Sequence, residues 1–153
     1  MDLGVSGKRV LITGGTKGIG RATVRAFVRG GARVAVCHHT DDEAAESLTR
    51  ELKEAGGEHV LVRADVTRPA DVARLAEACS AGLGGLDALV NNVGVDGAVA
   101  FQDLAEEEWN RVLDHNLTSV YRVTRAVLPL LSDGGSITTI GSSVALRGRS
   151  RGV

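Results

Sequence analysis

Short apolar runs rich in β-branched residues alternate along this chain with longer segments of helical periodicity. The runs are residues 9–13 (RVLIT), 33–37 (RVAVC), 59–62 (HVLV), 88–90 (ALV) and 136–140 (SITTI). Nearly continuous apolar strands of this kind are typical of parallel sheets that helices cover on both faces. The segment 41–57 places Ala45, Leu48, Leu52 and Ala55 at helical spacing. The alternation predicts an α/β fold of the Rossmann type, a doubly wound parallel sheet with helices on both faces.

The composition excludes several classes of protein. A chain of 153 residues has the length of one domain, and 43% hydrophobic residues with a net charge of -1 are ordinary for a globular protein. This charge is too close to zero to suggest a nucleic-acid partner. No apolar run approaches the roughly 20 residues of a membrane span, and the first residues lack the layout of a signal peptide. We therefore expect a single domain over residues 1–153, in the cytoplasm, with no nucleic-acid or membrane partner.

A glycine-rich turn joins the first predicted strand to the first predicted helix. It contains Gly14, Gly18 and Gly20 in the sequence TGGTKGIG, residues 13–20. Glycines at this place allow a tight turn and let backbone N–H groups at a helix N-terminus approach a pyrophosphate. Turns also collect glycine for conformational reasons alone. The position after a strand and before a helix favours a nucleotide site.

The spacing TGxxxGIG resembles that of the short-chain dehydrogenase/reductase family. Three later segments are also similar to motifs of this family: ADVT (64–67), LVNNVG (89–94, with Val93 where the family has Ala) and GSITTIGSS (135–143). The segment 107–131 matches the long central helix that precedes the last of them. These ordered motifs cover nearly the whole chain, and within the family they look closest to 3-oxoacyl-carrier-protein reductases and related ketoreductases.

The resemblance implies which residues bind the dinucleotide. Asp65 would accept a hydrogen bond from the adenine amino group, and the backbone of Val66 would hold the ring. The remaining contacts implied by the family motifs come from the glycine turn and from the segment 89–94: Gly14, Thr16, Lys17, Gly18, Ile19, Gly20, Asn92 and Gly94.

Asn116 stands out in the central helix before any family is considered. Helical periodicity places it on one apolar face with Trp109, Val112, Leu113, Leu117, Val120 and Tyr121. A buried amide must find partners, and a core asparagine or a helix-kink partner is one interpretation. The resemblance implies another, in which Asn116 is catalytic and holds a water in a proton relay.

The turn after the last predicted strand offers Ser142 and Ser143. The resemblance places the catalytic serine at Ser142, where its hydroxyl would stabilise the oxygen of a substrate carbonyl and not act as a nucleophile. We expect Ser143 to be a turn hydroxyl. No Ser-His-Asp triad is indicated, because His38, His39, His59 and His115 lie near strand or helix ends without a nucleophile-elbow motif. Cys37 and Cys79 show neither metal-ligand nor disulfide spacing, so we expect no metal site and two buried thiols.

Charge at the end of the second strand bears on the choice of cofactor. In dinucleotide folds an acid at this place binds the ribose 2′-OH and repels a 2′-phosphate. Here His38 takes the place of the acid, His39 and Thr40 follow, and Asp41 is expected to begin the next helix. Lys17 could reach the phosphate as a point charge. These residues could instead be solvated turn residues, but the missing acid favours NADP(H).

The family also has a catalytic tyrosine and lysine, which would fall just beyond Val153. Tyr121, the only tyrosine here, lies in the central helix and cannot replace it. We therefore expect residues 1–153 to lack the C-terminal part of the domain, to be inactive alone, and to need the rest of the fold, even as a separate chain. A final strand at an open sheet edge would favour aggregation.

Three classes of function fit this sequence to different degrees. The first is an NADPH-dependent oxidoreductase that acts on a small-molecule or carrier-bound ketone and forms a homodimer or homotetramer, as the resemblance implies. The second is a non-catalytic dinucleotide-binding or redox-sensing module, which would need neither Asn116 nor Ser142. The third, a scaffolding protein, is disfavoured by the intact glycine turn.

Overall fold

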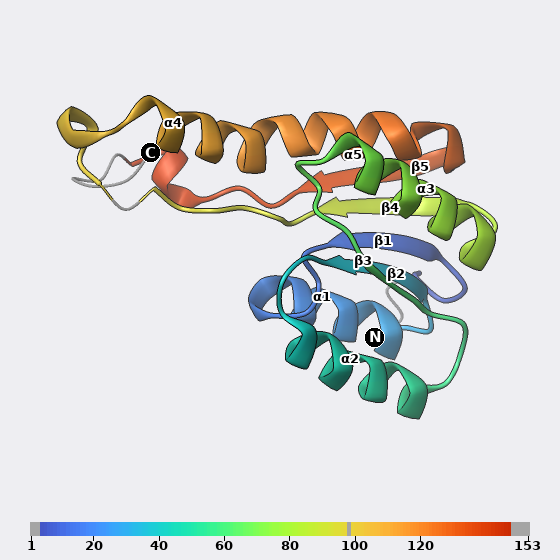
Figure 1. Ribbon diagram of the computed structural model, residues 1–153. Helices are drawn as coiled ribbons and strands as arrows, with labels where there is room; N and C mark the ends of the chain where they lie inside the picture. Colours follow the sequence, from blue (N-terminus) through green and yellow to red (C-terminus); the bar gives the residue numbers. More distant parts are fainter. Residues whose placement is uncertain (1–3, 98, 148–153) are drawn as a thin grey trace.

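The computed structural model describes residues 4–97 and 99–147, and Figure 1 shows their arrangement. The strands are β1 (Arg9–Thr13), β2 (Arg33–His38), β3 (Val60–Arg63), β4 (Leu86–Asn91) and β5 (Leu131–Thr139). The helices are α1 (Gly18–Arg29), α2 (Asp42–Ala55), α3 (Pro69–Leu83), α4 (Glu106–Leu113) and α5 (Ser119–Val127). A π-helical turn, η2 (Asp114–Thr118), joins α4 to α5, and short 3-10 turns lie at η1 (Phe101–Asp103), η3 (Leu128–Leu130) and η4 (Ser143–Ala145). Each predicted strand is therefore present, and β5 begins earlier than its apolar run.

The strands form one parallel sheet in the order β3-β2-β1-β4-β5. The chain moves outward from β1 to β3, then crosses back to the other side of β1 and continues to β5. This is the predicted doubly wound topology. In such a sheet, ligands bind outside the carboxyl ends of the strands, at the point where the strand order reverses. That point lies here between β1 and β4.

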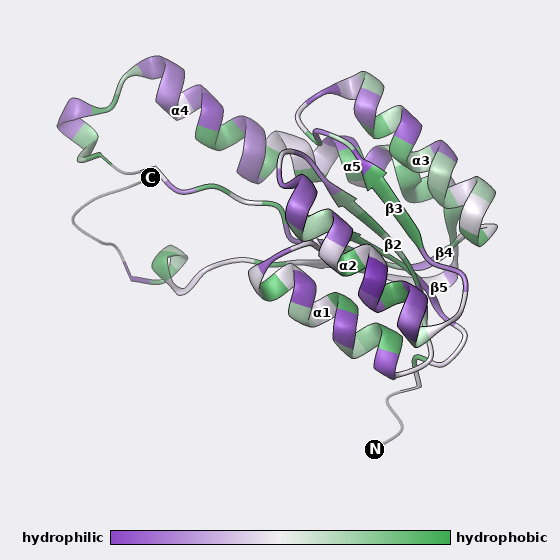
Figure 2. Cartoon of the chain, turned by 60° about the horizontal axis from the view of Figure 1, so that its bottom comes forward, coloured by the Kyte–Doolittle hydropathy of each residue, from purple (hydrophilic) through white to green (hydrophobic). Residues whose placement is uncertain are grey.

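Two apolar cores lie on opposite faces of the sheet. Alternate residues of β1 serve both: Val10 and Ile12 pack on the face covered by α1 and α2, and Leu11 packs on the face covered by α3 and α5. Figure 2 shows hydrophobic residues gathered on the strands and hydrophilic ones along α1 and α2. Cys37 and Cys79 are free thiols buried in the core under α3 and α5, which confirms the prediction that both are buried. Burial raises the pKa of Cys37 to about 11.

The apolar face predicted for the central helix is only partly correct: Val112 is buried, and Leu113 and Val120 are half-buried. Val123 and Val127 pack in the core formed with the sheet and α3, and Ser119 is also buried. By contrast, Trp109 is 40% exposed, Leu117 65% and Tyr121 58%. The π-turn changes the helical register between α4 and α5, so uninterrupted periodicity assigns the wrong residues of α5 to the buried side. Asn116 lies in this turn and is exposed, not buried.

Strand β5 lies at the edge of the sheet, as predicted for the last strand. Its residues from Asp133 to Thr139 are exposed, although Leu86–Asn91 of β4 pairs with it along one side. No helix within residues 4–97 and 99–147 is long and apolar enough to cross a membrane.

Candidate functional site

The glycine turn connects the carboxyl end of β1 to the first residues of α1. Gly14 and Gly18 adopt positive φ angles of 64° and 52°, which a residue with a side chain rarely adopts. No side chain caps the N-terminus of α1, and its first turn contains no acidic residue. The free N–H groups and the positive end of the helix dipole therefore favour an anion here.

Gly20 tests whether this turn fits a dinucleotide. A Cβ atom on Gly20 would lie 2.2 Å from the carbonyl oxygen of Gly14 and 2.5 Å from Asn92 Nδ2. The helix can approach the turn this closely only because Gly20 has no side chain. At Gly18, by contrast, the backbone is exposed and a Cβ would meet nothing within 4 Å, so the turn has room for a pyrophosphate and fits a dinucleotide.

Thr13 and Asn92 hold the turn against the end of β4. Asn92 Nδ2 donates hydrogen bonds to the carbonyl oxygens of Thr13 (2.9 Å) and Gly14 (3.0 Å). In return, Thr13 Oγ1 accepts from the backbone N–H of Asn92 and of Val93. The amide nitrogen of Asn92 thus fixes the turn, and its contact with a cofactor stays a prediction. Sequence analysis missed Thr13, although a polar residue ending a buried strand was the available signal.

The loop after β3 carries Asp65 and the buried Val66. Asp65 Oδ1 accepts from the N–H of Thr67 (2.9 Å) and from its hydroxyl (2.7 Å). Burial acts to raise the pKa of Asp65, but the bonds from Thr67 and the charges of His39 and His115 outweigh it and lower that pKa. The ionised carboxylate can only accept hydrogen bonds, as binding of an adenine amino group requires.

The amide of Asn116 makes hydrogen bonds from both its polar atoms to one residue. Its Oδ1 accepts from the N–H of Val95 (2.7 Å), and its Nδ2 donates to the carbonyl oxygen of Val95 (2.9 Å). This pair fixes the chain that leaves β4 against the π-turn. The side chain therefore positions a loop, and a role for Asn116 in holding a water of a proton relay stays a prediction.

Ser142 lies beyond the carboxyl end of β5. It caps η4, where its Oγ accepts a hydrogen bond of 3.3 Å from the N–H of Val144. A cavity of about 500 Å³ brings Ser142 together with Asn116 and with residues of the glycine turn and the β4 end. Its lining includes Ile19, Asn92, Gly94, Asn116 and Ser142 among the expected residues. Ser143 does not line it.

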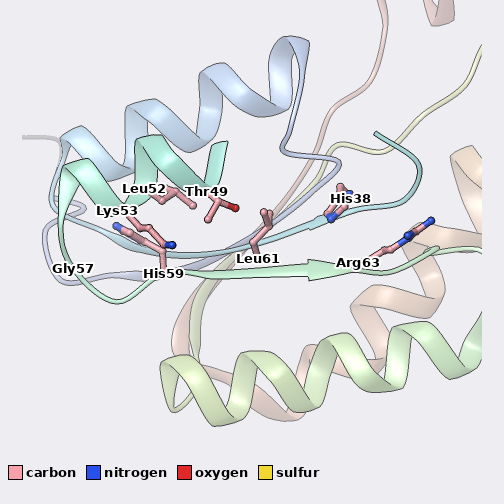
Figure 3. A pocket seen from close by; sticks show the side chains of 8 residues that line it. All are labelled: His38, Thr49, Leu52, Lys53, Gly57, His59, Leu61 and Arg63. Carbon is pink, nitrogen blue, oxygen red and sulfur yellow. The ribbon is translucent and has the colours of Figure 1, made fainter. Parts of the chain in front are cut away.

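His38 lies at a different cavity, between α2 and β3, with a volume of about 520 Å³. Figure 3 shows His38 and Arg63 at one end of it and Lys53 and His59 at the other. Burial lowers the pKa of His38, and its Nδ1 is buried without a partner among the described residues. The neighbouring His39 places Nε2 3.7 Å from Asp65 Oδ2. Both histidines thus lie at the carboxyl end of β2, near the loop Asp65–Thr67, which is expected to hold adenine and is called the adenine loop below.

Lys17 and Asp41 form an ion pair between the glycine turn and the start of α2. Asp41 also caps α2, since its Oδ1 accepts from the N–H of Ala44 at 2.8 Å. This confirms that Asp41 begins the helix. Its second oxygen nevertheless reaches Lys17, so the region expected to lack an acid contains one.

The residues of the candidate site lie along the carboxyl edge of the sheet. The loop Asp65–Thr67, the glycine turn and the cavity with the hydroxyl of Ser142 follow one another there, as an extended dinucleotide and a small substrate would require. A family profile described as short chain dehydrogenase matches residues 8–153. The chain belongs to the short-chain dehydrogenase family.

Curated relatives in this family have different activities. The chain is 36% identical over 140 residues to an uncharacterised oxidoreductase from Methylorubrum extorquens, covering 92% of this chain and 56% of that protein. It is 38% identical over 124 residues to 3beta-hydroxysteroid dehydrogenase 1 from Eggerthella lenta, covering 81% of this chain and 48% of that protein. The chain therefore spans about half the length of the curated relatives that it matches.

Solved short-chain dehydrogenase structures share this fold. One from Burkholderia cenocepacia, in complex with NADP, is 32% identical with a TM-score of 0.91, covering 97% of this chain and 60% of that one. The NADH-dependent reductase A1-R′, complexed with NAD, is 34% identical with a TM-score of 0.88, covering 99% and 66%. Solved structures similar to this chain therefore include one in complex with NADP and one complexed with NAD.

Proposed function

We propose that this chain is the cofactor-binding part of an NADP(H)-dependent oxidoreductase that interconverts a ketone and an alcohol. One observation carries the proposal: the 500 Å³ cavity joins Ser142 and Asn116 to Ile19 of the glycine turn. A pure dinucleotide binder would need only the turn. NADPH-dependent reduction of a ketone by a full-length protein that contains this chain tests the proposal.

Ser142 and Asn116 have different roles in the proposed reaction. The bound cofactor would supply the hydride. The hydroxyl of Ser142 donates a hydrogen bond to the substrate carbonyl oxygen and stabilises the charge that develops there. Asn116 holds Val95, and with it one wall of the cavity, in place. In a protein of the relatives' length, the family tyrosine and lysine would provide the proton.

Selectivity for NADP(H) is proposed from the positive and neutral groups near the adenine loop. Lys17, His38 and His39 surround the carboxyl end of β2, where an acid would repel a 2′-phosphate. Asp41 opposes this preference, because it neutralises Lys17 in the absence of ligand. A 2′-phosphate would have to compete with Asp41 for the lysine ammonium.

This competition gives a paired prediction. The unmodified full-length protein should bind NADPH at least about tenfold more tightly than NADH, which corresponds to about 1.4 kcal/mol. Lys17→Ala should reduce the ratio. Asp41→Asn should increase it, because asparagine preserves the helix cap and removes the competing charge. Equal affinity of the unmodified protein for both cofactors, measured by calorimetric titration, would contradict the assignment of Lys17.

The substrate class is proposed as a small-molecule or carrier-bound ketone, or the corresponding alcohol. Its support is the hydroxyl of Ser142 in a cavity with apolar walls from Val93, Val95 and Val120. The alternative is a non-catalytic, redox-sensing module that binds the dinucleotide without turnover. The two differ in the effect of Ser142, which only the enzyme requires.

A homodimer or homotetramer is proposed from exposed apolar residues on α4, η2, α5 and η3. These are Trp109, Leu117, Tyr121 and Leu128, and all are at least 40% exposed. A patch of large apolar side chains is typical of a protein interface.

We also propose a cytoplasmic location, because the thiols of Cys37 and Cys79 are free, as is usual in reducing compartments.

A further inference from the structure

Arg122 on α5 connects two parts of the proposed site that are far apart in sequence. Its Nη1 donates a hydrogen bond of 2.7 Å to the carbonyl oxygen of Thr67 and one of 2.6 Å to Asp114 Oδ1. The arginine side chain is only 27% exposed. One partly buried nitrogen therefore joins the adenine loop to the first residue of the π-turn.

Thr67, the first partner of Arg122, links the arginine to Asp65 through hydrogen bonds. The N–H and hydroxyl of Thr67 both donate to Asp65 Oδ1, and its carbonyl oxygen accepts from Arg122. Every polar group of Thr67 is thus engaged between the proposed adenine ligand and the arginine. A shift of Arg122 would move the loop that carries Asp65.

Asp114, the second partner of Arg122, links the arginine to Asn116. It begins the π-turn Asp114–Thr118, in which Asn116 is the central residue bonded to Val95. A π-turn is less favourable than regular α-helix and persists where neighbouring groups support it. The charge-assisted bond from Arg122 supplies such support.

We propose that Arg122 is a positioning residue that couples the adenine loop to the turn that holds Asn116. Binding of the adenine end then favours the arrangement of the cavity wall at Val95. This inference rests on the proposed function, since it assumes that Asp65 binds adenine and that Asn116 contributes to turnover. It assigns Arg122 no contact with substrate or cofactor.

A double-mutant cycle in the full-length protein tests the coupling. Arg122→Met should lower kcat about tenfold and weaken NADPH binding severalfold, a size typical of coupled neighbours. In an Asn116→Ala background, the same substitution should change kcat by less than about twofold, because the asparagine side chain that Arg122 positions is gone. Arg122→Lys should recover most of the loss, since one nitrogen makes both bonds.

The control is Arg25→Met, which breaks an exposed Arg–Glu51 pair of 2.6 Å between α1 and α2. It should leave kcat and NADPH affinity unchanged. If Arg122→Met fails to fold, Asp114→Asn enters the same cycle, since it removes one partner of the arginine. If Arg122→Met changes kcat by the same factor in the parent and in the Asn116→Ala background, the proposed coupling is wrong. The proposed oxidoreductase function would not be affected by that result. If Asn116→Ala keeps the kcat of the parent, the proposed role of Asn116 fails, and the coupling with it.

Discussion

Replacing Ser142 with alanine should lower kcat for ketone reduction about a hundredfold or more in the full-length protein. The hydroxyl acts on charge that develops only in the transition state, so its loss affects turnover and not ground-state binding. NADPH affinity should therefore stay close to that of the parent. Steady-state kinetics together with calorimetric titration of NADPH separate the two quantities.

Ser143→Ala is the matched control. Ser143 follows directly in the chain but does not line the cavity, so its loss should leave kcat nearly unchanged. The opposite result, with Ser143→Ala inactive and Ser142→Ala active, would mean that the assignment of the serine is wrong by one residue. Parental turnover in both variants would mean that neither serine takes part in catalysis.

Gly20→Ala should remove most NADPH binding. The added Cβ would stand 2.2 Å from the Gly14 carbonyl oxygen, so either the turn or the helix must move. We expect the affinity for NADPH to fall at least about tenfold, with a loss of about 1–3 kcal/mol in stability, as is usual for overpacking. Calorimetric titration and urea unfolding measure these effects.

Gly84→Ala provides the comparison for stability. Gly84 ends α3 with a φ of 75°, and a Cβ there would meet nothing within 4 Å. The left-handed conformation should cost about 1–2 kcal/mol in stability and leave NADPH affinity unchanged. If both variants bind NADPH like the parent, the glycine turn is not the pyrophosphate site.

Local patterns explain what the sequence could predict. The apolar runs of β1 and β2 are buried on both faces, and such runs identify parallel strands because no polar residue interrupts them. Gly14 and Gly18 are required by positive φ angles, a constraint that acts within the turn itself. Ser142 and Asn116 were placed by motifs, and the structure brings both to one cavity.

The features that were missed depend on long-range contacts or on local register. The pair between Lys17 and Asp41 joins two loops that only the packing of α1 and α2 brings together. The contact of Arg122 with Thr67 spans 55 positions, and nothing near Arg122 in sequence indicates it. The buried side of α5 was misassigned because a π-turn breaks helical periodicity, and single-residue register changes leave no compositional signal.

Transfer of deuterium tests the central claim, that this chain binds NADP(H) for hydride transfer at the cavity of Ser142. The full-length protein would be incubated with NADPH deuterated at the transferred position of the nicotinamide, and with a panel of 3-ketosteroids and 3-oxoacyl thioesters. Mass spectrometry then locates the label in the products. We predict deuterium on the carbinol carbon of at least one product, and its loss with Ser142→Ala. Tight NADPH binding with no deuterium in any product would contradict the account and favour a module that binds the dinucleotide without chemistry.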